Sequence, residues 1–197
     1  MAERVGKVEQ GEATRSLLVA TARKLFVERG YGGTSTEEIV RQAGVTRGAL
    51  YHHFRDKKDL FRAVHEQVEA EVTASIGETM ASGKDPIDML RIGVFAFLDA
   101  STDVDIARIA LVDAPSVLGW QEWREIDLRY GLGLLVAGLQ GGMDLGVLRP
   151  QPALPLAHLM LGAMSEAGML VANADDPVKA RAEVEPPLLG LVEGLRA

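Results

Sequence analysis

Residues 34–54 read TSTEEIVRQAGVTRGALYHHF, a pattern that predicts two short helices on either side of a turn. Ser35 is an N-cap residue for the first helix, and Glu38, three positions later, completes a capping box. Gly44 is expected in the turn, because glycine adopts a left-handed backbone at little cost. Thr46 then caps the second helix. The stretch therefore predicts a helix-turn-helix between about residues 35 and 54.

The second helix of this pair has distinct inner and outer sides. Leu50 and Phe54, four positions apart, lie on one side and are expected to anchor the helix to the protein. Arg47 and Tyr51 point away from that side, and Gly48 allows a close approach to another surface. A helix with such an outer side can enter the major groove of DNA, so we expect the segment to read DNA.

The rest of the chain shows apolar residues at helical spacing and no alternating strand pattern. We therefore expect an all-α fold, with Gly30 ending the first helix and Asp56 beginning a longer one. Residues 113–115 should interrupt the helices, and Pro186-Pro187 should kink or split the last one. Helices beyond residue 54 are expected near 56–80, 86–100, 104–111, 120–142, 155–173 and 177–196.

Charge is distributed unevenly along the chain. The formal net charge is −7, but residues 1–70 carry +2 and residues 71–197 carry −9. Residues 41–62 hold six basic and two acidic side chains, besides two histidines. A local basic patch can attract phosphates even on an acidic protein, because distant charges are screened. Taken alone, the charge pattern favours a solvated helix face over a phosphate-binding patch.

The composition limits the other functions. The chain has no cysteine, which excludes disulfides and thiolate metal sites, and no two histidines have the spacing of a helical metal site. The first residues lack the apolar run of a signal peptide, and the longest apolar stretches are broken well short of a membrane span. We expect a soluble cytoplasmic protein without a cofactor, a metal ion or a membrane partner.

An enzyme is one alternative. Glu37 and Glu38 are adjacent carboxylates, but neighbouring positions on a helix point apart. His158 and Glu166 share a helix face without any nucleophile or phosphate-loop motif beside them, so catalysis is not expected. A helical adaptor that binds only proteins is a second alternative, and DNA binding itself would exclude it.

The stretch from Leu18 to Leu60 resembles the DNA-binding domain of the TetR (tetracycline-repressor) family. The resemblance implies a three-helix DNA-binding domain at 12–70 and a helical ligand-binding and dimerisation domain at 71–197. It also implies a homodimeric repressor that binds a palindromic operator until a small molecule releases it. The matching residues are Leu25-Phe26, Gly30-Tyr31, Thr34-Ser35, Ile39, Ala43-Gly44-Val45-Thr46-Arg47-Gly48, Leu50-Tyr51-His52-His53-Phe54 and Lys57.

Carried over by position, the resemblance implies DNA contacts from Ser35, Thr36, Thr46, Arg47, Gly48, Tyr51, His52, His53 and Lys57. Arg47 can bind guanine with its forked guanidinium or only a phosphate. Thr46 and the helix N-terminus can hold a phosphate. Tyr51 can donate to a phosphate or pack on Lys57. Thr36 departs from the apolar residue that is common at its place in the family.

The same resemblance assigns the last two helical segments, about 155–173 and 177–196, to a dimer interface, and the second domain to a small-molecule effector. Large apolar side chains of that domain can line an effector pocket, although each of them also suits plain core. Asp99 can orient a ligand or form an ion pair. The candidates favour a largely apolar effector and are Phe95, Phe97, Asp99, Trp120, Trp123, Met143 and Met164.

Overall fold

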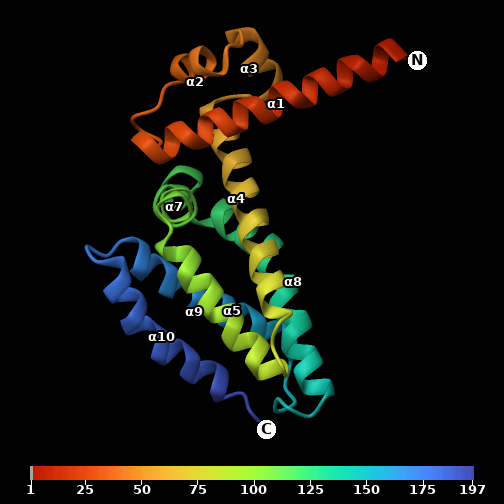
Figure 1. Cartoon of the computed structure of the whole chain (residues 1–197), viewed down its shortest axis with the longest axis vertical. Helices are drawn as coiled ribbons and strands as arrows, with labels where there is room; N and C mark the ends of the chain where they lie inside the picture. The colour runs from red at the N-terminus through yellow and green to blue at the C-terminus, as the bar shows by residue number, and fades with distance from the viewer. Residues whose placement is uncertain (1) are drawn as a thin grey trace. The chain divides into compact units, whose positions relative to one another are not determined.

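The computed structural model describes the backbone of residues 2–197 and the side chains from Gln10 onward. Its contacts divide the chain into two compact units, one up to Gln67 and one from Val68 onward. Both units are helical, and within the described part of the chain the only strand-like pairing is an isolated bridge between Leu148 and Arg196. The predicted all-α fold is confirmed (Figure 1).

The first unit contains α1 (Ala2–Arg29), α2 (Thr36–Ala43), α3 (Arg47–His53) and the beginning of α4 (Lys57–Met80). All four helices contribute to one apolar core, which gives the two short helices a firm base. Burial of such side chains supplies stability that helices of seven and eight residues lack on their own. The fully buried core residues include Leu18, Ala22, Leu25, Phe26, Ile39, Leu50, Leu60, Phe61 and Val64.

The turn between α1 and α2 is held by both aromatic and polar contacts. Gly30 ends α1 with a left-handed backbone (φ 71°). The rings of Phe26, Tyr31 and Phe61 pack with centroids 5.2 to 5.7 Å apart. The buried Thr34 hydroxyl donates to the carbonyls of Leu25 at 3.1 Å and Gly30 at 2.9 Å. These contacts fix where α2 begins.

The second unit is built around α9, which packs against α5, α8 and α10. Side chains from these helices and from the end of α4 form its core, with Leu98, Leu139 and Val171 fully buried. The remaining elements of the unit are α5 (Pro86–Thr102), α6 (Val104–Ile106), the π-helix η1 (Ala107–Asp113), α7 (Ala114–Leu118), α8 (Trp120–Asp144), α9 (Ala153–Ala172) and α10 (Pro177–Glu193).

The predicted interruption at residues 113–115 is wrong. Helical backbone continues from η1 into α7, and Pro115 lies in the first turn of α7. The break comes instead at Gly119, whose φ of 87° separates α7 from α8. Burial of the Trp123 indole, which donates from Nε1 to the Ala110 carbonyl at 3.0 Å, fastens α8 to η1.

Pro186 and Pro187 do not split the last helix. α10 runs from Pro177 to Glu193 through both prolines, and a proline should be costly there because it lacks the N–H that a helix uses. Both prolines are exposed, as are Ala182 and Glu183 one turn earlier, so water can bond to the carbonyls that the prolines leave unpaired. Leu188 and Val192 still reach the core beyond them.

The expectation that every apolar stretch falls short of a membrane span also needs correction. Among the described residues, α9 is long and apolar enough to cross a bilayer, with a mean hydropathy of 1.4 over 18 residues. Within the second unit, 44% of that window is buried against other helices. Core helices of soluble proteins meet the same criterion, so it does not by itself place α9 in a membrane.

Candidate nucleic-acid interface and internal cavity

The helix-turn-helix is closed by the caps that the sequence predicts. The Ser35 hydroxyl accepts a hydrogen bond from the Glu38 N–H at 3.1 Å, and the Thr46 hydroxyl accepts one from the Ala49 N–H at 3.1 Å. Gly44 ends α2 with φ 66°, in the left-handed region that favours glycine. Both N-caps and the glycine turn are therefore confirmed.

The capping box forms only in part. The Glu38 carboxylate does not return to the backbone of Ser35; it accepts hydrogen bonds from Arg41 at 2.6 Å and Gln42 at 2.9 Å. The hydrogen bonds from these two residues, Arg41 first, lower the pKa of Glu38 to about 2. Because a charged partner one turn away holds the carboxylate more strongly than a neutral backbone N–H, the local cap is completed by Ser35 alone.

The outer side of α3 is open to solvent while its inner side is buried. Leu50 and Phe54 are buried in the core of the first unit, whereas Tyr51 is exposed and the Arg47 side chain is 70% exposed. The Arg47 guanidinium lies 5.5 Å from the centre of the Tyr51 ring and 3.7 Å from a carboxylate oxygen of Glu37. An exposed pair of this kind is held loosely, so Arg47 can exchange Glu37 for another anion.

The small and polar residues of α3 complete this outer side. Thr46, Gly48 and His52 are exposed, and a Cβ on Gly48 would meet only the Thr46 hydroxyl, at 3.8 Å. His53 is half-buried against Phe54, with ring centroids 6.4 Å apart. Burial, followed by the charges of His52 and Arg15, lowers the pKa of His53, so its imidazole is neutral at physiological pH.

A shallow depression of about 440 Å³ lies beside this outer side and brings together residues from three stretches of the first unit. Ser35 is exposed at its rim, and the Thr36 hydroxyl donates to the Glu37 carboxylate at 3.2 Å. The hydroxyl, phenol and ammonium groups of the depression suit phosphate oxygens, whereas its two carboxylates, Glu37 and Asp56, oppose them. Its lining includes Gly32, Gly33, Thr34, Ser35, Thr36, Glu37, Tyr51, Asp56 and Lys57.

Lys57 has internal partners as well as a place in that depression. Its ammonium group donates to the carbonyls of Tyr31 at 2.8 Å and Thr34 at 2.9 Å, and lies 4.0 Å from the centre of the Tyr31 ring. Burial lowers the pKa of Lys57. Since an ammonium group has three N–H donors, these two bonds leave one for a phosphate.

The residues that the sequence suggests for an effector pocket are not brought together. Phe97 and Met164 line one internal cavity, but Phe95 and Asp99 line a separate open depression. Asp99 accepts a hydrogen bond from Arg181 at 2.7 Å, which makes it part of an ion pair between α5 and α10. Of the other three, Trp120 is exposed and Trp123 is buried against η1. Met143 packs against the core of the second unit.

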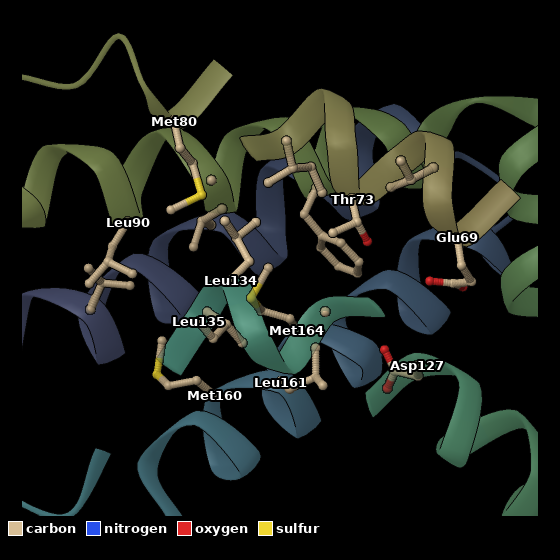
Figure 2. A pocket seen from close by; sticks show the side chains of 17 residues that line it. Glu69, Thr73, Met80, Leu90, Asp127, Leu134, Leu135, Met160, Leu161 and Met164 are labelled. Carbon is tan, nitrogen blue, oxygen red and sulfur yellow. The ribbon is translucent and has the colours of Figure 1, made fainter. Parts of the chain in front are cut away.

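The internal cavity lies within the second unit and has a volume of about 60 Å³. Figure 2 shows the carboxyl groups of Glu69 and Asp127 at the same end of it, with Met80, Leu90 and Met160 at the other. Helices α4, α5, α8, α9 and α10 all contribute. The lining residues are Glu69, Val72, Thr73, Ile76, Met80, Leu90, Gly93, Val94, Phe97, Asp127, Gly131, Leu134, Leu135, Met160, Leu161, Met164 and Val192.

The two carboxyl groups differ in their surroundings. Asp127 forms an ion pair with Arg124 and accepts a hydrogen bond from the Ser165 hydroxyl at 3.1 Å. Burial raises the pKa of Asp127, and these partners oppose the rise. Burial, and then the negative charge of Asp127, raise the pKa of Glu69 to about 8. Glu69 therefore keeps its proton at neutral pH.

Sequence reasoning missed Glu69 and Asp127, although a signal for Glu69 exists. On α4, Glu69 shares one face with Val72, Ile76 and Met80, because these positions follow helical spacing. A carboxylate on an otherwise apolar helix face points either to a buried polar partner or to a cavity. Asp127 carries a similar signal, since Gly131 and Leu134 follow it on one face of α8.

In comparison with known proteins, both units match domain models of the same protein family. Residues 18–64 match the model of bacterial regulatory proteins of the tetR family, and residues 87–195 match the tetracyclin repressor-like C-terminal domain. A crystal structure of a TetR-family transcriptional regulator from Pectobacterium atrosepticum is 35% identical, with a TM-score of 0.88, and the match covers 96% of this chain and 97% of that one. Reduced NemR from Escherichia coli, at 21% identity and a TM-score of 0.71 over 94% and 97%, shares the fold.

Curated relatives match over a smaller part of their length. The TetC protein of transposon Tn10 from Escherichia coli is 35% identical over 130 residues, which are 64% of this chain and 63% of TetC. The regulator AcrR from Shigella flexneri is 34% identical over 104 residues, which are 52% of this chain and 48% of AcrR. The chain thus spans less than two thirds of these two relatives.

Proposed function

Because the chain belongs to the TetR family of bacterial regulatory proteins, we propose that it is a sequence-specific DNA-binding repressor of transcription. The observation that carries the proposal is the division of α3 into a buried inner side, with Leu50 and Phe54, and an open outer side, with Arg47 and Tyr51. A helix anchored in this way can lie in a major groove without disturbing the core behind it. The activity is binding and not catalysis, and it takes place in the cytoplasm without a cofactor.

The proposed contacts fall into two groups. Arg47, Gly48 and Tyr51 face bases or the nearest phosphates, since they lie on the open side of α3. Hydroxyl and imidazole groups around them position the helix on the sugar–phosphate backbone, which carries no sequence information itself. The second group comprises Ser35, Thr36, Thr46, His52 and His53, with the remaining N–H of Lys57.

We also propose that two copies bind one palindromic operator, because a single short helix reads too few bases for useful specificity. Half-sites would be separated by about 34 Å or by a larger distance characteristic of the family. Helices α9 and α10 are the proposed dimer surface. Each carries large apolar side chains that are exposed in the single chain, namely Leu154, Leu159, Leu170, Val178 and Leu191.

The internal cavity is the proposed effector site. An effector releases DNA only if it binds the DNA-free arrangement more tightly than the DNA-bound one. Most of the cavity lining is apolar, which fits a largely apolar effector. The domain limits 12–70 and 71–197 stay part of this proposal, which is supported by a division of the chain into two compact units after Gln67.

The test is binding to the DNA upstream of the protein's own gene, measured by fluorescence anisotropy against a shuffled sequence. Arg47→Ala should lower specific affinity at least about tenfold and reduce the salt slope by about one. The control is Arg41→Ala, whose side chain is 71% exposed against 70% for Arg47 but is held by Glu38. Equal loss in both variants, or wild-type protein that binds the two DNAs alike, would refute the proposed reading helix. If the protein is a repressor, deletion of its gene should also increase transcription from the DNA that it binds.

A further inference from the structure

Glu37 places a carboxylate on the side of the first unit where the DNA contacts are proposed. Its side chain is 64% exposed in the first turn of α2, and one of its oxygens lies 3.7 Å from the Arg47 guanidinium at the start of α3. A carboxylate on a surface that binds DNA weakens the attraction to every phosphate nearby. The position of Glu37 therefore needs an explanation other than overall attraction to DNA.

Local hydrogen bonds keep this carboxylate charged and in place. Bonds from its own backbone N–H and then from the Thr36 hydroxyl, 3.2 Å away, lower the pKa of Glu37. The start of a helix also favours an anion, because the free N–H groups of the first turn point toward it. Glu37 therefore stays ionised beside Arg47 at neutral pH.

Arg47 meets this carboxylate on one side and an aromatic ring on another. Its guanidinium carbon lies 5.5 Å from the centre of the Tyr51 ring, while Nη1 faces Glu37. A guanidinium has five N–H donors on several edges, so a partner on one edge leaves another free. Exposed ion pairs are weak in water, but charges interact more strongly once DNA displaces the water around them. An anion that reaches Arg47 in the interface must therefore displace Glu37 or tolerate its repulsion.

We propose that Glu37 determines what Arg47 reads: the carboxylate rejects phosphate and leaves the guanidinium to the major-groove edge of guanine. Guanine presents two acceptors, N7 and O6, without a formal charge, so it can bind a free edge of Arg47 while Glu37 stays in contact. A phosphate carries a full negative charge and competes with Glu37 for the same cation. Glu37 thus determines specificity through Arg47. The inference rests on the proposed function, because it requires α3 to lie in the major groove.

The consequence is a lower affinity for DNA of unrelated sequence. Non-specific binding comes from phosphate contacts, and each phosphate that is neutralised steepens the dependence of log affinity on log salt by about 0.9. Glu37→Gln keeps the length of the side chain and removes its charge, so Arg47 becomes free to bind phosphate. Affinity for unrelated duplexes should then rise about fivefold at about 0.1 M salt, with little change for the operator. The ratio of the two affinities should fall by about the same factor.

The experiment first selects an operator from a random duplex library with the full wild-type chain, and then measures affinities by fluorescence anisotropy. Each operator guanine is replaced in turn by 7-deazaguanine, which lacks the N7 acceptor, and each phosphate by an uncharged methylphosphonate. At least one 7-deazaguanine should lower the affinity about fivefold or more, and Arg47→Ala should remove that loss. Glu37→Gln should make the same loss smaller, because Arg47 then divides its time between guanine and phosphate. The control for loss of one charge is Glu28→Gln on α1, whose carboxylate pairs with Lys24 at 4.0 Å, and it should behave like wild type.

Three results would overturn the inference. The first is an unchanged ratio of operator affinity to unrelated affinity in Glu37→Gln. The second is that Arg47→Ala removes sensitivity to a methylphosphonate and not to a 7-deazaguanine, which would assign Arg47 to phosphate. The third is that Glu37→Gln changes the ratio equally in the wild-type and Arg47→Ala backgrounds, which would mean that Glu37 contacts a base directly.

The scan of modified DNA with wild-type protein and Arg47→Ala involves no change at Glu37, so it decides the second result even if Glu37→Gln fails to fold. Failure of this inference is distinguishable from failure of the proposed function. A wild-type protein that selects an operator but reads it without help from Glu37 keeps the proposed function and loses the inference. If the selection enriches no sequence, both are overturned.

Discussion

Lys57 shows how one side chain can serve the fold where sequence reasoning sees only a ligand contact. Its position at the start of α4 predicts a phosphate contact, yet its ammonium group lies over Tyr31 and donates to the carbonyls of Tyr31 and Thr34. These carbonyls belong to the turn that precedes α2. Lys57 therefore helps to set the position of the helix-turn-helix, whether or not its third N–H meets DNA.

Replacing Lys57 by Met tests this structural role. The change removes the donor of two partly buried carbonyls, so we expect it to destabilise the protein by about 1–3 kcal/mol in urea unfolding. Lys24→Met is the control, because the Lys24 side chain is 71% exposed and its ion pair, with Glu28 at 4.0 Å, lies on the surface. Equal stability of the two variants would assign Lys57 to DNA contact alone.

Glu69 makes the stability of the protein depend on pH. Its pKa is raised to about 8 in the folded chain, so the folded state holds the proton more tightly than the unfolded state. Stability is therefore complete below about pH 4.5, falls as the unfolded state ionises and stops falling above about pH 8. Glu69→Gln should equal wild type at pH 4.5 and exceed it by about 2–4 kcal/mol at pH 8.5, measured by thermal unfolding. A constant difference across this range would show that the carboxyl is not buried.

At the scale of the elements, the close approach of α5 and α9 depends on Gly168. A Cβ at this position would lie 2.8 Å from the Phe97 ring and 3.1 Å from the Ser101 hydroxyl, both of which are on α5. The Ser101 side chain is itself tied to the Phe97 carbonyl at 2.9 Å, so it has little freedom to move away. The two helices can pack at this distance only with glycine between them.

Gly168→Ala should therefore destabilise the second unit by about 1–3 kcal/mol, because one methyl group must force the helices apart. Gly133→Ala, in α8, is the matched control: a Cβ there meets nothing within 4 Å. That variant should be more stable than wild type by about 0.5–1 kcal/mol, since alanine favours helix. Chemical denaturation of both proteins compares the two effects, and a neutral Gly168→Ala would contradict the packing described.

Local features of the helix-turn-helix could be predicted from the sequence, because Ser35, Gly44 and Thr46 act on neighbours within four residues. The course of the chain between residues 104 and 118 could not, since this segment contains a π-helix that packs against Trp123 of α8, which is distant in local spacing. The internal cavity was even harder to predict from the sequence. Its walls come from five helices, and only Phe97 and Met164 among the expected residues reach it, because convergence of side chains is a property of packing and not of spacing.

For the whole molecule, the proposed dimer explains why α9 and α10 keep large apolar side chains in solvent. Leu159→Glu should raise the dimer dissociation constant at least about tenfold, because it introduces a charge into the proposed interface. Light scattering with size-exclusion chromatography measures the effect. Leu145→Glu is the control, as Leu145 is 72% exposed against 73% for Leu159 but follows α8. A dimer that persists unchanged in Leu159→Glu would move the interface elsewhere.

The boundary between the two units falls between Gln67 and Val68, inside the continuous helix α4 and not in a linker. Each residue inserted into a helix rotates all that follows by about 100° and advances it by about 1.5 Å. Length variation among natural homologues should therefore accumulate at the turn of residues 82–84 and be rare inside α4. Anyone who grafts the first unit onto another member's second unit must keep this helix uninterrupted across the join.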